Sequence, residues 1–370
     1  MRGPACAANG ESLLMKRILI ANIFGIGDVL FTTPLIATLR REFEGVEIDY
    51  LSNARTKDIV RDIPGVGGNF IYEKDDFSDL WRSSKAGFFK AVSRLFTGVR
   101  KKKYDAVFDF TLSREFGLFF ALCGIRRRIG LDYKGRGMFL TDKIPLEGFE
   151  GRHVAEHYLD LLAPLGVFSP VKEMRIIPDE KSSAEAGEYL KEKGGPSPLV
   201  AVIPGGGASW GGHASRKRWQ AEGFARTADI LAENAFAVAV MGDTSEQALC
   251  QSVAEKMKND PVFVENNLDL GTYAALLARC ELVLCNDGGP LHMAVALGVR
   301  TVSIFGPVDE AVYGPYPPSD RHRVITAQEL ECRPCYGRFK LPECDKDNKC
   351  LADIRAEKVA EACMNSAITA

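Results

Sequence analysis

Short runs of β-branched and other apolar residues alternate along the chain with longer stretches whose apolar positions recur at helical spacing. In the first half, the short runs predict strands over residues 17–21, 46–51 and 104–110. Pro34 interrupts the segment 29–43, and because a proline inside a helix breaks it, we expect the main helix to open there. Such alternation is typical of βαβ units and parallel sheets.

A second series of strands begins after a predicted helix at 152–165 and a charged, Pro-, Gly- and Ser-rich stretch at 166–198. The predicted strands of this series are 199–204, 236–241, 261–265, 282–286 and 300–305. A chain of 370 residues is longer than one core usually supports. We therefore predict an α/β protein of two Rossmann-like domains, with parallel sheets facing a central cleft.

The domain boundaries follow from the same pattern. Met15 stands directly before the first strand, so residues 1–15 are expected to form a disordered extension. An N-terminal domain is predicted over 16–170 and a C-terminal domain over 171–354, and 355–370 is predicted to be a C-terminal helix.

Composition changes this picture little. The chain is 46% hydrophobic and 26% charged, with a formal net charge of -2, so any electrostatic partner must be recognised by a local patch. No nucleic-acid partner is expected. The sequence shows neither a bilayer-spanning run nor the features of a signal peptide, which predicts a cytoplasmic protein with mostly reduced cysteines.

The first candidate for chemistry is Asp28, in the turn that follows the first strand. Ligands of open α/β sheets bind beyond the carboxyl ends of strands, and Gly25 and Gly27 let the backbone bend and a ligand approach. A dinucleotide fingerprint is the competing interpretation, but Leu30 occupies its third glycine position. An aspartate here is commonly a helix cap. The other motifs of the chain favour a catalytic base instead.

A second candidate is the helix start that follows the strand 282–286. Pro290 suits a first helical turn and Gly298 the left-handed residue after the last one. Gly288 and Gly289 supply no capping side chain, so free N–H groups could bind a phosphate. Asp287 could accept hydrogen bonds from sugar hydroxyls. The alternative is an ordinary tight connection with a core histidine.

The loop after residue 204 carries three glycines followed by Arg216, Lys217 and Arg218. Cationic side chains on a glycine-rich turn suit a diphosphate leaving group, although a solvated surface loop has the same composition. No Asp-X-Asp motif stands at a strand end to hold a metal. We therefore expect that the protein needs no metal cofactor for chemistry.

Residues 80–104 carry eight Lys/Arg and no acidic residue, with apolar residues at helical spacing. This pattern predicts either a basic amphipathic helix on an anionic membrane surface or a helix that covers a sheet with a solvated basic face.

Four cysteines cluster near the C-terminus. They are Cys332, Cys335, Cys344 and Cys350. Clustered thiols of a cytosolic chain can hold a structural zinc ion, but the spacing lacks a second Cys-X2-Cys pair. Reduced structural cysteines or a disulfide stay as alternatives.

Three motifs, in this order, resemble glycosyltransferase family 9, the ADP-heptose:lipopolysaccharide heptosyltransferases. They are "GIGDVLFTTPLIATLRREF", "PGGGASW" with "KRW", and "NDGGPLHMAVALGVRTVSIFGPVDEAVYGPY". The cysteine segment "CRPCYGRFKLPECDKDNKCLADI" is similar to the tail of many members. The resemblance spans roughly residues 16–354 and implies a GT-B fold with an inverting, metal-independent mechanism.

The resemblance also implies roles for individual residues. Asp28 matches the family's base, and Gly25 and Gly27 belong to the acceptor-side loop. The residues matched to donor binding are Ser209, Lys217, Glu246, Asp287, Gly288, Gly289, Pro290 and His292. The longer loop "GGHAS" before Lys217 departs from the family's usual pattern, which affects the placement of Ser209.

The function predicted from these motifs is transfer of heptose from ADP-L-glycero-D-manno-heptose to the inner core of lipopolysaccharide, with type II favoured. The lipid A–core acceptor would bind the first domain at the inner face of the cytoplasmic membrane. A family 9 enzyme with another nucleotide sugar and a non-catalytic nucleotide-sugar-binding protein remain as alternatives. An NAD-dependent enzyme is disfavoured by the missing glycine.

Overall fold

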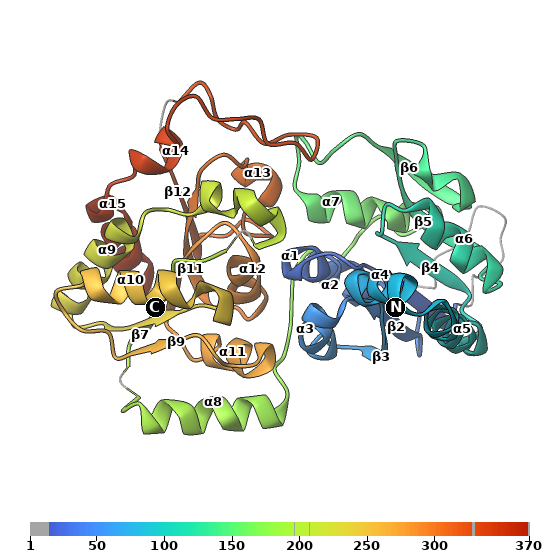
Figure 1. Cartoon of the computed structure of the whole chain (residues 1–370), viewed down its shortest axis with the longest axis horizontal. Coiled ribbons are helices and arrows are strands. Elements are labelled where there is room, and N and C mark those ends of the chain that lie inside the picture. Colours follow the sequence, from blue (N-terminus) through green and yellow to red (C-terminus); the bar gives the residue numbers. More distant parts are fainter. Residues whose placement is uncertain (1–14, 196, 207, 328–329, 369–370) are drawn as a thin grey trace. The chain divides into compact units, whose positions relative to one another are not determined.

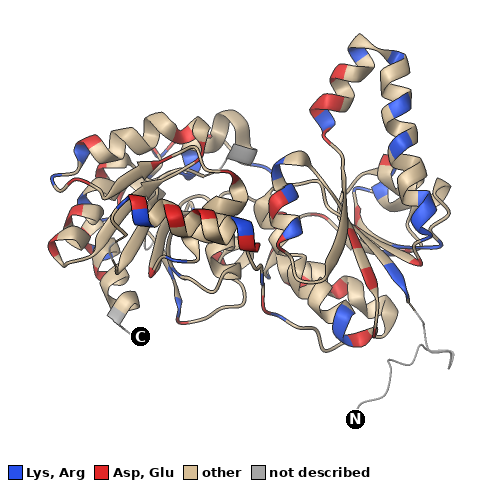
Figure 2. Ribbon diagram, turned by 90° about the horizontal axis from the view of Figure 1, so that it is seen from below, with Lys and Arg blue, Asp and Glu red and all other residues tan. Residues whose placement is uncertain are grey.

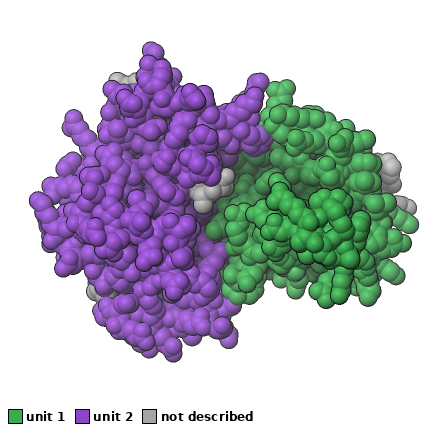
Figure 3. Space-filling view, viewed as in Figure 1, with its two compact units in different colours: residues 1–149, 154–173 green, residues 150–153, 174–370 purple. Residues whose placement is uncertain are grey.

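The computed structural model describes all residues except 1–14, 196, 207, 328–329 and 369–370, and it leaves the side chains of 208, 209 and 368 undescribed. The described chain forms two compact units, coloured separately in Figure 3. Unit 1 comprises residues 1–149 and 154–173, and unit 2 comprises 150–153 and 174–370. The extension predicted before the first strand falls on residues outside the described part, except for Met15, which is buried.

Unit 1 is built on a six-stranded parallel sheet (Figure 1). In sheet order its strands are β3 (Val66–Ile71), β2 (Glu47–Ser52), β1 (Arg17–Ala21), β4 (Ala106–Asp109), β5 (Arg127–Tyr133) and β6 (Asp142–Leu146). Its α-helices are α1 (Ile26–Leu30), α2 (Thr33–Glu42), α3 (Lys57–Arg61), α4 (Lys74–Ser83), α5 (Lys85–Lys102), α6 (Arg114–Leu122) and α7 (Val154–Leu159). α2 begins at Thr33 with Pro34 in its first turn, which confirms the prediction for that proline.

Unit 2 contains the second parallel six-stranded sheet. In sheet order its strands are β12 (His322–Thr326), β11 (Arg300–Phe305), β10 (Leu282–Asn286), β7 (Leu199–Ile203), β8 (Ala237–Met241) and β9 (Phe263–Glu265). Its α-helices are α8 (Glu180–Glu192), α9 (Ala221–Glu233), α10 (Gln247–Lys256), α11 (Leu270–Leu277), α12 (Gly289–Ala296), α13 (Glu310–Tyr313), α14 (Lys349–Ala352) and α15 (Ala356–Ile368). The central strands β7, β10 and β11 carry buried residues almost throughout, as strands covered on both faces should.

Most strands found by pattern lie inside the sheets, with β9 at an edge as the exception. All eight predicted strands are present, within a few residues of their predicted ends. The four strands missed by pattern are β3, β5, β6 and β12. β3, β6 and β12 lie at sheet edges, where one side is open and the hydrophobic signal weakens, and β5 begins with two arginines.

Two parallel Rossmann-like sheets confirm the predicted fold class. Among the helices of the described residues, none is both long and apolar enough to cross a membrane.

Candidate active site

Two buried asparagines hold the turn that follows β1. Asn22 donates from Nδ2 to the carbonyl of Asp28 at 3.0 Å, and its Oδ1 accepts the Phe24 N–H at 3.1 Å. Asn53, after β2, donates to the carbonyls of Ile23 and Phe24 at 2.9 and 2.6 Å. Because these amides satisfy the backbone of the turn, α1 starts at a fixed place beyond the carboxyl end of β1.

Asp28 lies in the first turn of α1, three residues after the N-cap Gly25. Its Oδ2 accepts the Gly25 N–H at 3.3 Å, and the side chain is partly exposed. Burial raises the pKa of Tyr50, and the charge of Asp28 adds to that rise, which places the carboxylate close to this tyrosine. Asp28 therefore makes a helix-terminal contact and still borders solvent, as a base must. Its catalytic role stays a prediction.

The two glycines of this turn are not needed for an unusual backbone. Gly25 has φ -76° and ψ 177°, and Gly27 lies within α1. Both conformations are open to any residue, so the expectation that these glycines bend the chain is wrong. Close approach of a ligand is the remaining reason for them, and it stays a prediction.

In unit 2, Asn286 at the end of β10 connects three segments. Its Nδ2 donates to the carbonyls of Pro204 and Gly205 at 2.7 and 3.0 Å. Its Oδ1 accepts the Trp219 N–H at 2.9 Å. These hydrogen bonds hold the glycine loop after β7 and the chain entering α9 against the end of β10, just before α12.

This arrangement brings Lys217 and Asp287 together. Lys217 Nζ lies 2.5 Å from Asp287 Oδ2, and the two residues are only 8% and 3% exposed. The ammonium group also lies 4.5 Å from the centre of the Trp210 ring. Charges so deeply buried are stable only when paired, so this pair fixes a cation directly before α12.

The start of α12 agrees with the sequence prediction. The helix begins at Gly289 with Gly288 as N-cap, no side chain caps it, and Pro290 lies in its first turn. Gly298 follows its end with φ +74°, the left-handed geometry that favours glycine. N–H groups without a capping side chain at a helix start are suited to anions.

His292 is buried in the first turn of α12. Burial, then the nearby charges of His153 and Lys217, lower its pKa from 6.5 to about 3. The ring is therefore neutral at physiological pH and adds no cation to the site. His153, in the linker segment of unit 2, stacks on Tyr316 at 4.7 Å, and its Nε2 lies 3.0 Å from the Gly314 carbonyl oxygen.

The Glu246 side chain binds the glycine loop that follows β7. Its Oε1 accepts the Gly206 N–H at 2.6 Å and lies 3.4 Å from Arg218 Nη2. Arg218 also donates to the Gly206 carbonyl at 2.9 Å. A Cβ added to Gly205 would lie about 2.1 Å from the Glu246 carboxyl group, so a larger residue there would displace that group. The predicted nucleoside contact of Glu246 stays a prediction, and the side chain of Ser209 lies outside the described residues.

Three of the four clustered cysteines lie in the loop 332–344, and Cys350 lies in α14. Arg333 pairs with Glu310 at 2.7 Å, the N–H groups of Cys335 and Tyr336 both donate to Pro307, and Arg216 donates to the Pro342 carbonyl at 2.5 Å. Cys332 and Cys344 are exposed, Cys335 is partly buried and Cys350 is buried, all as free thiols. In the described part of the chain, no group of three or more His, Cys, Asp or Glu could hold a metal ion. The structural zinc stays a prediction without geometric support.

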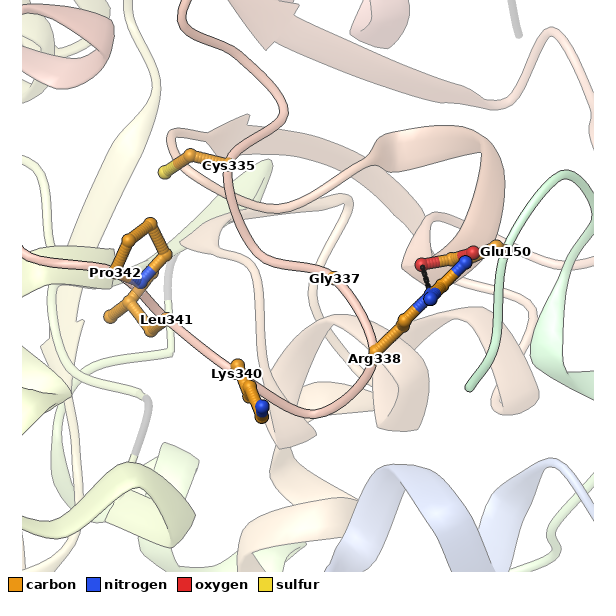
Figure 4. A pocket seen from close by; sticks show the side chains of 7 residues that line it. All are labelled: Glu150, Cys335, Gly337, Arg338, Lys340, Leu341 and Pro342. Carbon is orange, nitrogen blue, oxygen red and sulfur yellow. Dashed lines mark ion pairs between the residues drawn. The ribbon is translucent and has the colours of Figure 1, made fainter. Parts of the chain in front are cut away.

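Figure 4 shows an open pocket formed by this cysteine loop. It is lined by Glu150, Cys335, Gly337, Arg338, Lys340, Leu341 and Pro342. Arg338 and Glu150 form an ion pair across it at 3.5 Å. None of the predicted donor-binding residues lines this pocket.

Sequence reasoning missed the amides that hold the site. Asn22 directly follows β1, Asn53 follows β2 by one residue, and Asn286 ends β10. A buried polar residue at the carboxyl end of a parallel strand was the signal that could have identified them.

Comparison with known proteins places these motifs in a family. Residues 92–344, more than half of the chain, match Glycosyltransferase family 9 (heptosyltransferase). The chain belongs to glycosyltransferase family 9. The family 9 chain is 31% identical over 163 residues to lipooligosaccharide heptosyltransferase 2 of Campylobacter jejuni, covering 43% of this chain and 48% of that relative. The match thus spans about half of that protein's length.

A longer match relates the family 9 chain to lipopolysaccharide heptosyltransferase 3 of Escherichia coli K12. It is 24% identical over 344 residues and covers 91% of this chain and 94% of that protein. Among solved structures, a family 9 glycosyltransferase of Veillonella parvula matches with TM-score 0.80 at 22% identity, over 96% and 98% of the two chains. The E. coli ADP-heptose heptosyltransferase II matches with TM-score 0.75 at 20% identity, over 96% and 99%. These structural likenesses support the GT-B fold.

Replacing Lys217 by methionine leaves the Asp287 carboxylate buried without its partner. We expect Lys217→Met to destabilise unit 2 by about 3–5 kcal/mol. Adding Asp287→Asn should restore much of this loss, because no buried charge then remains. Urea unfolding of the single and double variants measures the effect.

The matched control is Lys256→Met. Lys256 pairs with Glu222 at 2.9 Å on the surface, so its loss should cost no more than about 1 kcal/mol. Equal destabilisation by the two lysine variants would contradict a larger stability cost for breaking the buried pair.

The neutral state of His292 predicts a pH dependence of stability. Its folded pKa of about 3 lies below its ordinary value of 6.5, so below pH 6.5 the unfolded chain binds a proton that the folded chain does not. Its contribution is complete above pH 6.5 and falls by about 1.4 kcal/mol per pH unit as pH drops toward 3. The free energy of unfolding of His292→Gln should therefore fall less steeply in acid than that of the wild type.

His213, which is exposed, provides the control. His213→Gln should keep the wild-type slope. Burial also lowers the pKa of His322, to about 4, so the His292 variant should retain part of the slope. A slope unchanged by His292→Gln would contradict its burial as a neutral ring.

Proposed function

We propose that the protein transfers heptose from ADP-L-glycero-D-manno-heptose to the inner core of lipopolysaccharide, as a heptosyltransferase of type II. The relatives described above are named heptosyltransferases of lipooligosaccharide or lipopolysaccharide. A solved structure with the same fold is an E. coli heptosyltransferase with ADP, which supports a nucleotide-sugar donor. Relatives at 31% identity that are named type 2 support the choice of type.

The buried Lys217–Asp287 pair beside the uncapped start of α12 is the observation that carries this proposal. Lys217 and the N–H groups of α12 supply positive charge at one place, so they would stabilise the diphosphate as it leaves. Asp287, once its lysine turns to the diphosphate, would accept hydrogen bonds from the donor sugar. Because this charge is built into the protein, the proposed reaction needs no metal ion.

The proposal assigns the base to unit 1. Asp28 would remove the proton of the acceptor hydroxyl as its oxygen attacks the anomeric carbon and the bond from that carbon to the diphosphate oxygen breaks. Attack from the face opposite ADP inverts the anomeric configuration. The lipid A–core acceptor is assigned to unit 1 and the donor to unit 2. The enzyme would work at the cytoplasmic face of the membrane that holds this acceptor.

Loss of the Asp28 carboxylate should separate chemistry from nucleotide binding. In an assay of ADP release from ADP-heptose with a lipid A–core acceptor, Asp28→Asn should lower turnover by roughly 10²–10⁴-fold. Calorimetric titration should show unchanged ADP affinity, because the proposal assigns the donor to unit 2.

Asp75→Asn is the matched control, since Asp75 also lies in the first turn of a helix, α4. It should leave turnover unchanged. Full activity of Asp28→Asn would overturn the base assignment, and ADP release that requires a different nucleotide sugar would overturn the donor.

Metal independence is tested directly with a chelator. Because Lys217 and α12 provide the charge for the leaving group, transfer should proceed at the same rate in EDTA as in Mg²⁺. Activity that disappears in EDTA and returns with added Mg²⁺ would contradict this part of the mechanism.

A further inference from the structure

Helix α5 divides into two halves with different surroundings. In the second half, Val99 is buried, and Leu95 and Phe96 pack against the apolar cluster of unit 1. The first half has no buried residue. In Figure 2 the α4–α5 hairpin stands out from unit 1, with basic residues spaced along α5. The sheet-covering interpretation of this helix therefore holds only for its second half.

Aromatic side chains cluster on the projecting part of the hairpin. The Trp81 ring lies 5.0 Å from that of Phe88 and 6.4 Å from that of Phe89. Trp81 is 47% exposed and Phe89 is 62% exposed. Large apolar side chains so exposed are not accounted for by packing within the described part of the chain.

The exposed apolar surface continues between α5 and α6. Positions spaced by three or four residues on both helices line a common groove. They are Phe89, Val92, Ser93 and Phe96 on α5, and Glu115, Leu118, Phe119 and Leu122 on α6. Leu122 is 59% exposed and Leu118 is 39% exposed. We call Trp81, Phe89, Val92, Phe96, Leu118 and Leu122 the apolar strip.

Positive charge lies beside this strip along α5, whereas the acidic residues of the hairpin, Asp75, Asp76 and Asp79, lie on α4. Lys85 Nζ lies 3.2 Å from the centre of the Trp81 ring, and the Arg100 guanidinium lies 5.7 Å from that of Phe96. Lys90 and Arg94 are exposed on the same helix. The segment 80–104 holds eight Lys/Arg and no acidic residue. The groove contains one carboxylate, Glu115, which accepts a hydrogen bond from Ser113 at 2.6 Å.

We propose that the apolar strip binds the surface of an anionic lipid bilayer. Exposed aromatic and aliphatic side chains would enter the boundary between headgroups and acyl chains, while the lysines and arginines meet anionic headgroups. A second copy of the chain is a poor occupant, because the exposed lysines and arginines of its α5 would face those of the first copy, and Glu115 is the one carboxylate among the residues that line the groove. Bilayer binding goes beyond the proposed transfer reaction and requires no turnover.

Vesicle sedimentation tests the proposal without acceptor or donor. The intact protein should bind phosphatidylcholine vesicles that contain phosphatidylglycerol, and binding should fall as salt screens the charges. Pure phosphatidylcholine should bind much less. Phe89→Ser with Leu122→Ser should lower vesicle affinity roughly tenfold or more, because both apolar side chains are lost. Lys90→Gln with Arg94→Gln should lower affinity for the anionic vesicles only.

Matched controls use exposed phenylalanine and lysine residues that lie outside the apolar strip. Phe168 is 79% exposed and Lys181 and Lys191 are exposed on α8, so Phe168→Ser and the double variant Lys181→Gln, Lys191→Gln should bind as the wild type. Unfolding midpoints and ADP affinity should be equal in all variants, which excludes misfolding as a cause.

Two results would overturn the proposal. One is equal vesicle binding by the wild type and the Phe89, Leu122 variant. The other is a lipid-free dimer, seen by sedimentation velocity, that this variant abolishes, since a second copy would then be the occupant. Neither result depends on whether the protein transfers heptose, so failure of the transferase proposal is recognised separately by the ADP-release assay.

Discussion

The ion pair between Lys217 and Asp287 is the interaction on which the candidate site of unit 2 depends. Two charges that are more than nine-tenths buried are tolerated only as partners. Their meeting requires that the glycine loop after β7 and the end of β10 be held together, and Asn286 does this with three hydrogen bonds. Asp287 directly precedes Gly288, the N-cap of α12, and no side chain caps that helix. Under the proposed function, Lys217 and this helix start would both meet the diphosphate.

Unit 1 uses neutral amides for a comparable purpose. Asn22 and Asn53 satisfy the backbone of the turn after β1, which leaves Asp28 at the helix start and partly exposed. The division of labour is chemical. In the proposed reaction, unit 2 would supply positive charge for the leaving group, whereas unit 1 would present a carboxylate that accepts a proton. Membership of glycosyltransferase family 9 agrees with both halves of this arrangement.

The two halves of helix α5 share one sequence pattern but have different surroundings. Its apolar residues recur at helical spacing over the whole length, but only the second half lies over the sheet, where Val99 is buried. The first half projects with α4 and keeps Phe89 exposed. Periodicity gives the face that a helix will bury. It does not say whether protein, lipid or nothing covers that face, because the answer depends on where the sheet ends.

The sequence alone determined the two parallel sheets, the helix opened by Pro34, and the glycine-bounded α12, because local spacing and backbone preference decide these features. It could not determine the edge strands β3, β6 and β12, whose hydrophobic signal is weak where one side is open. It also could not show that Lys217 meets Asp287, seventy residues later, or that Glu246 binds Gly206. Those contacts join distant segments, and only packing of the sheet brings the ends of its strands to one edge.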